Sequence, residues 1–174
     1  MSKTKPSVPT GVNHVVLNVR DIDVSHRFYT EVLGYTYVGS VVGPAAEMMT
    51  MRFFSFGEKH HDIALIEERE RGSVDKGGRP EGLSHLAIGY PDRDSFLNQI
   101  QHLQACGVDF HMRGNHGMTH SAYIYDPDGN SLEVLYELPR DLWKGDIEAA
   151  LTYFDPLPLS GPESLEDTTD YERF

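Results

Sequence analysis

Two histidines and one glutamate have the side-chain types and the spacing of a metal site. His14 closes the segment Gly11-Val-Asn-His14, His85 closes Gly82-Leu-Ser-His85, and Glu133 lies 48 residues after His85. Two imidazoles and a carboxylate on one face can hold iron(II) with open coordination positions, and these donors also suit zinc, manganese and nickel. Glu133 lies in an apolar run, where a carboxylate is costly unless it is paired or binds a cation. The alternative for Glu133 is an edge strand with the carboxylate in water.

Predicted strands carry all three residues. Residues 11–19 and 82–90 are rich in β-branched and other apolar residues, and they predict the strands of the two histidines. Residues 121–137 predict a β-hairpin, because Asp126-Pro127-Asp128-Gly129 is typical of a tight turn between two alternating runs. Glu133 then lies in the middle of the return strand.

The other segments complete two similar halves. Helices are expected over 21–34 and 92–107, and further strands over 35–39, 47–56, 60–67 and 108–112. Val24, Phe28 and Val32 are expected to form the apolar stripe of the first helix. Both halves then have the order βαβββ, and we expect His61 and Glu133 to occupy equivalent places on the last strand of each half.

These patterns predict an α+β fold. Two paired βαβββ modules, residues 11–67 and 82–137, are expected to form a metal-binding cup within a single domain of residues 11–137. Residues 68–81 are expected to link the modules. Residues 1–10 are expected to be a flexible leader, and residues 138–174 a C-terminal extension with a short helix near 145–153.

The composition narrows the classes of function. The chain has 174 residues, of which 39% are hydrophobic and 24% charged, as in an ordinary globular protein. Its formal charge of −12 argues against nucleic acid and anionic membranes as partners. Cys106 is the only cysteine, which excludes a disulfide within the chain and a cysteine-based zinc site. Because the sequence has no long apolar segment, we expect a soluble cytoplasmic protein.

The repeated Gly-x-x-His openings and the run from Asp126 to Glu133 resemble the vicinal oxygen chelate superfamily over about residues 11–137. This superfamily includes glyoxalases, bleomycin resistance proteins and dioxygenases. More narrowly, His61-Asp62-Ile63-Ala64-Leu65 resembles the type I extradiol catechol dioxygenases. A histidine at this point, followed by Asp or Thr and an apolar run, is the acid–base of those enzymes. Glyoxalases generally place a metal-binding carboxylate there.

The resemblance implies roles for nine residues. The expected metal ligands are His14, His85 and Glu133. The expected catalytic residues are His61, Tyr123 and His116. The expected substrate-binding residues are His120, Tyr125 and Arg113, with His120 as the alternative to His116 beside the substrate and Tyr125 as the competitor of Tyr123.

The resemblance also implies an activity, which is extradiol cleavage of a catechol-type substrate with iron(II), or manganese(II), and O₂. His61 would take a proton from the catechol and later return one, and the product would be a muconic semialdehyde-type compound. One alternative is a glyoxalase- or epimerase-like lyase or isomerase with zinc or nickel. Another is a resistance protein that binds a small molecule without catalysis. The open sheet edges and the proline-rich tail are compatible with a homodimer.

Overall fold

The computed structural model describes residues 9, 11–41, 49–57, 59–68, 82–165, 167 and 173–174. The predicted linker, apart from residue 68, and the predicted leader, apart from residue 9, lie outside the described residues. The chain divides into two compact units, which we call the first unit (Met1–Thr30 and Gly34–Gly72) and the second unit (Glu31–Leu33 and Ser73–Phe174). In the described ranges, no helix has the length and apolar character needed to cross a membrane.

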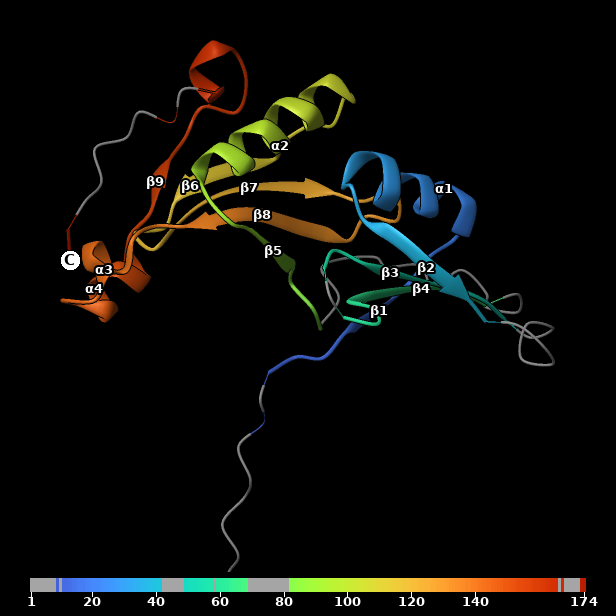
Figure 1. Ribbon diagram of the computed structural model, residues 1–174. Helices are drawn as coiled ribbons and strands as arrows, with labels where there is room; N and C mark the ends of the chain where they lie inside the picture. Colours follow the sequence, from blue (N-terminus) through green and yellow to red (C-terminus); the bar gives the residue numbers. More distant parts are fainter. Residues whose placement is uncertain are drawn as a thin grey trace, which may run out of the picture. The chain divides into compact units, whose positions relative to one another are not determined.

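The first unit combines a helix with a four-stranded sheet (Figure 1). Its elements are β1 (Val15–Asn18), α1 (Ile22–Arg27), β2 (Thr36–Ser40), β3 (Met49–Ser55) and β4 (Ile63–Glu68), and a π-helical turn over Phe28–Val32 continues α1. The strand order is β1-β4-β3-β2, in which β1 is parallel to β4 and the other pairs are antiparallel. Asp21 caps α1, because its Oδ1 accepts hydrogen bonds from the backbone N–H groups of Asp23 and Val24 at 2.9 and 3.0 Å.

The buried side of α1 differs from the predicted apolar stripe. Ile22 and Tyr29 are at most 5% exposed, whereas Val24 is 39% exposed. Residues seven apart lie on the same face of a helix, so Ile22 and Tyr29 reach the sheet together. The Tyr29 ring packs near that of Phe54 on β3, with 6.2 Å between the ring centroids. The large aromatic side chain therefore takes the core position that Val24 was expected to share.

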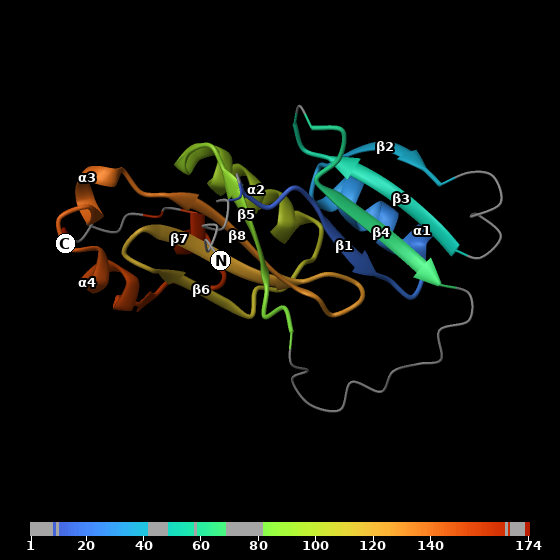
Figure 2. The same ribbon diagram turned by 90° about the horizontal axis from the view of Figure 1, so that it is seen from below.

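The second unit contains a five-stranded sheet with helices before and after its hairpin (Figure 2). Its elements are β5 (Leu86–Tyr90), α2 (Arg93–Ala105), β6 (Met112–Asn115), β7 (Thr119–Tyr125), β8 (Ser131–Glu137), α3 (Arg140–Trp143), α4 (Ile147–Thr152), β9 (Asp155–Pro156) and a 3₁₀ turn over Pro162–Leu165. The strand order is β5-β8-β7-β6-β9, in which β5 is parallel to β8 and the other pairs are antiparallel.

Helix α2 covers one face of this second sheet (Figure 1). Its side chains Phe96, Ile100 and Leu103 are fully buried. The Phe96 ring lies 5.3 Å, centroid to centroid, from the ring of Tyr136 on β8. Because side chains alternate along a strand, the residues of β8 with the parity of Tyr136 face α2, and Glu133 faces the other way.

The predicted α+β fold and the βαβββ order of each half are confirmed. The two openings also share a backbone conformation, because Gly11 has φ 144° and Gly82 has φ 138°. Only glycine adopts these angles readily, which explains the glycine three residues before each strand histidine. The predicted helix near 145–153 is found as α4, and α3 precedes it.

The β7–β8 turn is organised by the carboxylate of Asp126. Its Oδ1 accepts hydrogen bonds from the backbone N–H groups of Asp128 and Asn130 at 2.9 and 2.8 Å, and its Oδ2 accepts one from Asn130 Nδ2 at 2.8 Å. Asp126 is 4% exposed. Gly129 has φ 83°, a left-handed conformation that glycine adopts without strain. This turn fixes the register of the two strands that carry Tyr123 and Glu133.

We expect Asp126→Ala to lower the free energy of unfolding by about 2 kcal/mol, because it leaves two part-buried backbone N–H groups without their charged acceptor. Urea denaturation at pH 7 measures this change. Asp155→Ala, which removes an exposed carboxylate of the same unit, is the matched control, with an expected change within about 0.5 kcal/mol. Equal effects of the two variants would contradict the role given to Asp126.

Candidate functional site

Glu133 is a buried carboxylate with two side-chain partners. It is 6% exposed, although it lies on the face of the sheet that α2 does not cover. Its Oε2 lies 3.0 Å from Nε2 of His85. Its Oε1 accepts a hydrogen bond from the Tyr123 hydroxyl at 2.8 Å. The strand register explains both contacts, since Tyr123 pairs directly with Glu133, and Ala87, two residues after His85, pairs with it on the other side.

His116 extends this row of contacts by one step. Its Nε2 lies 3.1 Å from the Tyr123 hydroxyl oxygen. The hydroxyl has one hydrogen, which it donates to Glu133, so we infer that His116 Nε2 donates to the tyrosine oxygen. Four predicted site residues of the second unit therefore lie in one connected row, in the order His85, Glu133, Tyr123 and His116.

Burial shifts the pKa values of two members of this row. Burial, reinforced by the hydrogen bond to Glu133 and its charge, raises the pKa of Tyr123 far above its usual value. Burial also lowers the pKa of His116, and the charge of Glu133 opposes that shift. Tyr123 consequently stays a protonated donor and His116 a neutral imidazole near neutral pH.

The geometry of His85 and Glu133 fits a shared metal ion. Nitrogen and oxygen ligands lie about 2.0–2.2 Å from such an ion, so two ligands at right angles are about 3 Å apart. The Nε2–Oε2 distance of 3.0 Å has this value. The buried carboxylate of Glu133 and the partly exposed imidazole of His85 also form a donor set that suits iron, manganese, zinc and nickel.

In the first unit, His14 lies beside His61. Their ring centroids are 4.6 Å apart. Nδ1 of His14 lies 2.7 Å from Oδ1 of Asn13, which is an acceptor, so Nδ1 carries the proton and Nε2 keeps its lone pair. This is the tautomer in which Nε2 can bind a metal. The contact with Asn13 is therefore compatible with the predicted ligand role of His14, which remains a prediction.

His61 is held at the entry to β4. Its ring packs 5.0 Å from that of Phe53, and its Nδ1 lies 2.7 Å from Nδ1 of His60. Burial and the charges of His60 and His14 lower the pKa of His61, while Asp62 opposes the shift. The buried Asp62 carboxylate accepts hydrogen bonds from Ser55 Oγ and the backbone N–H of Phe56 at 3.0 and 3.1 Å. Asp62 is therefore a structural anchor that fixes the residue beside it.

His61 does not occupy the strand position of Glu133, contrary to the expected equivalence. Val16, two residues after His14, pairs with Ala64, whereas Ala87, two residues after His85, pairs with Glu133. By register, the counterpart of Glu133 is Ala64, and His61 lies before β4 begins. Equal spacing along the sequence hid this difference, because the loops of the two halves differ in length.

The structure places two of the predicted substrate-binding residues, His120 and Arg113, on the opposite face of the sheet. His120 lies on the α2 face of the sheet, fully buried, with Nδ1 2.7 Å from Oδ1 of Asp167. Arg113 is also buried on that face, where it donates to the carbonyl oxygens of Pro158 and Ser164 at 2.9 and 2.7 Å. Neither reaches the row of Glu133 and Tyr123, because strand alternation points them to the opposite side. His116, and not His120, lies beside Tyr123.

Tyr125 is on the same face as Tyr123 but is 55% exposed at the end of β7. Its ring stacks on that of His111, with 4.3 Å between the centroids and an angle of 18°. The predictions from sequence gave no role to His111, whose ring also lies 6.0 Å from that of Tyr123. They also missed Phe154, whose ring lies 5.3 Å from that of His116. No local spacing signals either contact, since both depend on how distant segments pack.

The three-ligand metal site remains a prediction. His14 belongs to the first unit, whereas His85 and Glu133 belong to the second. Among the side chains that the structure describes, no group of three or more His, Cys, Asp or Glu residues is placed to hold a metal ion. The structure shows His85 beside Glu133 in the second unit, and His14 with its Nδ1 beside Asn13 Oδ1 in the first.

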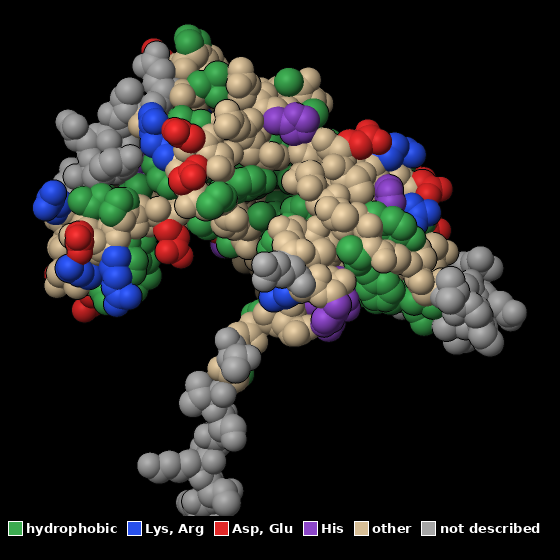
Figure 3. Space-filling model, viewed as in Figure 1, with side chains coloured by type: hydrophobic (Ala, Val, Ile, Leu, Met, Phe, Trp, Pro, Cys, Tyr) green, Lys and Arg blue, Asp and Glu red, His purple; other side chains and the backbone are tan. Residues whose placement is uncertain are grey.

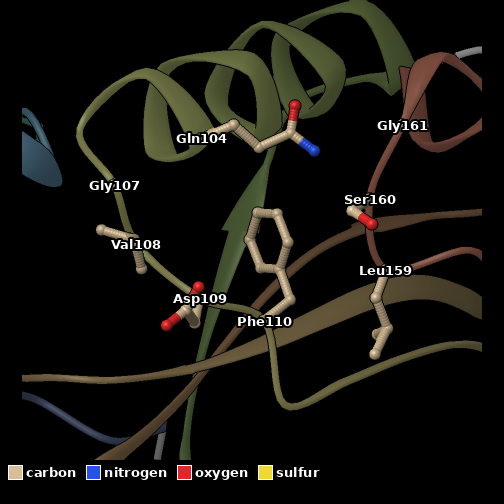
Figure 4. A pocket seen from close by; sticks show the side chains of 8 residues that line it. All are labelled: Gln104, Gly107, Val108, Asp109, Phe110, Leu159, Ser160 and Gly161. Carbon is tan, nitrogen blue, oxygen red and sulfur yellow. The ribbon is translucent and has the colours of Figure 1, made fainter.

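A pocket of about 440 Å³ lies at the C-terminal end of α2, between that end and residues 159–161 (Figure 4). It is lined by Gln104, Gly107, Val108, Asp109, Phe110, Leu159, Ser160 and Gly161. None of the nine predicted site residues lines it. On the face shown in Figure 3, acidic and basic side chains are interspersed, and no basic patch is visible.

Comparisons with known proteins identify relatives of two activities. The profile of the Glyoxalase/Bleomycin resistance protein/Dioxygenase superfamily matches residues 11–134. The chain is 29% identical over 121 residues to biphenyl-2,3-diol 1,2-dioxygenase 3 of Rhodococcus globerulus, a match that covers 70% of the chain and 60% of that enzyme. It is 30% identical over 122 residues to a probable lactoylglutathione lyase of Synechocystis, covering 70% of the chain and 92% of that protein.

A solved structure agrees with these matches. The glyoxylase/bleomycin resistance protein/dioxygenase domain from Frankia is 25% identical, with a TM-score of 0.61 over 75% of this chain and 100% of that one. The matches with the dioxygenase and with the lyase have nearly the same identity. Identity alone therefore does not separate a dioxygenase from a lyase.

A second polar cluster lies on the opposite face of the sheet, the face that α2 covers. Asp167 Oδ1 lies 2.7 Å from His120 Nδ1, and its Oδ2 accepts from the Tyr136 hydroxyl at 2.7 Å and lies 3.5 Å from Arg93 Nε. Burial alone raises the pKa of Asp167, but the hydrogen bond and charge of His120, the Tyr136 hydroxyl and the charge of Arg93 outweigh it, so this pKa lies below its usual range.

We expect Asp167→Asn to lower the free energy of unfolding at pH 7 by about 3 kcal/mol, because it breaks a buried charge cluster. The pKa of Asp167 is lowered on folding, so its contribution is present above the ordinary carboxyl pKa of about 4 and is lost as the pH falls through the lowered value. Urea denaturation at pH 7 and at about pH 3 measures this. Asp141→Asn, which breaks an exposed pair with Lys144, is the control, with an expected effect below about 1 kcal/mol. A pH-independent difference would contradict the role of the charge.

Proposed function

Because the chain belongs to the glyoxalase/bleomycin resistance/dioxygenase superfamily, we propose that it is an extradiol dioxygenase that cleaves a catechol-type substrate with iron(II) and O₂. The observation that carries this proposal is His61 beside His14, with ring centroids 4.6 Å apart. Extradiol enzymes have an acid–base histidine at this point of the sequence, and glyoxalases generally have a metal-binding carboxylate. A neutral histidine next to a predicted ligand supports proton transfer at bound substrate more than a fourth ligand.

The metal assignment rests on the donor set. We propose that His14, His85 and Glu133 bind iron(II), and that manganese(II) is an acceptable substitute. The 3.0 Å separation of His85 Nε2 and Glu133 Oε2 and the free Nε2 of His14 support this set. When bound, the ion supplies coordination of the catechol oxygens and of dioxygen, together with the electron transfer that activates oxygen.

The chain's own residues then supply proton transfer and hydrogen bonds. His61 Nδ1 is engaged by His60, which leaves Nε2 to take a proton from a catechol hydroxyl and to return a proton later in the reaction. Its lowered pKa keeps the imidazole neutral before the substrate binds. Tyr123, with its raised pKa, stays protonated and donates a hydrogen bond to a substrate oxygen in place of Glu133. Both oxygen atoms of O₂ enter the ring-opened semialdehyde product.

One observation favours a second candidate function. The matched part of the chain covers 92% of the probable lactoylglutathione lyase of Synechocystis, but 60% of the Rhodococcus dioxygenase. The match thus extends over nearly the whole lyase but over only part of the dioxygenase. In a lyase of this kind, His14, His85 and Glu133 would hold zinc or nickel, which would supply Lewis acidity, and His61 would have no matching role.

Oxygen uptake separates the two functions. After anaerobic loading with iron(II), we expect the protein to consume one O₂ per catechol and to form a yellow ring-cleavage product, because extradiol cleavage places both oxygen atoms in the product. An oxygen electrode and visible absorption over a panel of catechols measure this. Metal binding without oxygen uptake, together with conversion of the glutathione–methylglyoxal adduct, would instead identify the lyase. Failure to bind any divalent metal would exclude both enzymes and favour a binding protein.

A pair of variants distinguishes the catalytic acid–base from the ligands. We expect His61→Ala to retain stoichiometric iron but to lower kcat by about 10²–10⁴-fold, since it removes proton transfer alone. Glu133→Gln should lose the iron, because it removes the charged ligand of a buried site. Glu137→Gln, four residues further along β8 and exposed, is the matched control and should retain both iron and activity. Iron content after gel filtration and oxygen uptake measure these outcomes. Loss of iron from His61→Ala would make His61 a ligand and favour the lyase.

A further inference from the structure

The C-terminal extension packs around the strand end that carries His116. β9 pairs with β6, so that Pro156 lies opposite Gly114 and Asp155 opposite Asn115. The backbone N–H of Leu157 also donates to the carbonyl of Arg113 at 3.1 Å. This extension lies beyond residue 134, where the superfamily match ends. Its contacts with β6 therefore belong to a part of the chain that the superfamily match does not cover.

Phe154, the residue before β9, occupies the space that a side chain at position 114 would fill. A Cβ atom added to Gly114 would lie 2.3 Å from Cε2 of Phe154. Gly114 pairs with Ser121 on β7 and therefore shares the face of Tyr123 and Glu133. The same phenyl ring lies 5.3 Å, centroid to centroid, from the imidazole of His116. Phe154 thus covers the strand and contacts His116 on the face of the candidate site.

The turn after His116 packs closely against α4 and the C-terminal residue Phe174. Gly117 has φ 76°, and a Cβ atom there would lie 2.7 Å from the carbonyl oxygen of Ala150 in α4 and 3.1 Å from the ring of Phe174. Asn115 Oδ1 accepts a hydrogen bond from the backbone N–H of Gly117 at 2.7 Å. Gly114 and Gly117 flank Asn115 and His116. At both positions the extension approaches the backbone too closely for a larger side chain.

We propose that the C-terminal extension is part of the site, and that Phe154 is a positioning residue that holds His116 against the Tyr123 hydroxyl. This inference rests on the proposed function. It assigns the extension a task in the reaction, because the orientation of His116 fixes which hydrogen bond Tyr123 can make. Phe154 is 49% exposed, so its ring remains partly accessible to solvent.

The electrostatic setting of His116 agrees with this arrangement. Burial lowers the pKa of His116, the charge of Glu133 raises it, and those of His85 and His120 lower it. Removing the Phe154 ring exposes the imidazole to water and should move its pKa upward, toward the ordinary value. A change confined to fold stability would leave this pKa where it is.

Two substitutions test the same contact from opposite sides. Gly114→Ala pushes the Phe154 ring off the strand, and Phe154→Ala removes the ring. We expect each to raise the titration midpoint of His116, measured by NMR of the ¹⁵N-labelled full-length protein, and to lower kcat about tenfold with a smaller change in KM. In the double variant the added methyl group meets no ring, so it should be no worse than Phe154→Ala alone.

Gly89→Ala is the matched control. Gly89 is a strand glycine of the same sheet, and a Cβ atom there would meet nothing closer than Leu135 Cδ1 at 4.0 Å. This variant should keep the His116 titration and kcat of the original protein. Phe154→Leu, which keeps an apolar cover, should restore most of the activity lost in Phe154→Ala. Circular dichroism and urea denaturation verify that each variant is folded.

Two outcomes would overturn the inference. An unchanged His116 titration in the folded Phe154→Ala and Gly114→Ala variants would show that the ring does not position the imidazole. Additive losses in the double variant would show that the two residues act separately. The NMR measurement needs no turnover, so it tests the role of Phe154 even if no catechol is cleaved and the proposed function fails.

Discussion

The pairing of the buried Glu133 carboxylate with His85 and Tyr123 is the interaction on which the arrangement of the second unit depends. A carboxylate with 6% exposure is tolerated only because His85 and Tyr123 face its two oxygens. These partners come from β5 and β7, which flank β8 on its two sides. A slip of register by one residue would turn Glu133 toward α2 and leave its charge in the apolar core. The strand pairing that forms the sheet therefore also gives the charge of Glu133 its two partners.

The two faces of this sheet carry different groups: the candidate site lies on one face and a buried polar cluster on the other. His85, Tyr123 and His116 lie with Glu133 on the face that α2 leaves free. On the covered face, Asp167 joins His120, Tyr136 and Arg93 in a buried charged cluster. Successive residues along β7 and β8 thus face the candidate site and the buried polar cluster in turn. The extension takes part on both sides, through Phe154 and through Asp167.

Local patterns in the sequence predicted the βαβββ order of each half and the hairpin at Asp126, because short-range alternation and turn residues encode them. Boundaries were less accurate: the strand expected over 108–112 is β6 (Met112–Asn115), and His14 and His85 each lie one residue before their strands begin. Contacts between distant segments were not accessible in this way. The positions of His120 and of Val24 depend on which face a strand or helix turns to the core, and the partners of His116 depend on a segment some forty residues away. Spacing also misled at His61, whose count from His14 resembles that of Glu133 from His85 although its register does not.

The parallel pairing of β5 with β8 has a consequence for the order of folding. The β7–β8 hairpin closes through a tight turn, so Tyr123 and Glu133 can meet early, through local contacts. His85 approaches Glu133 only after a chain segment of 48 residues has been closed, a slower event because of its loop entropy. We therefore expect the contact between His85 and Glu133 to form late, and an unfolded chain does not present it. A metal ion that bound these two side chains would stabilise the native state selectively, by mass action.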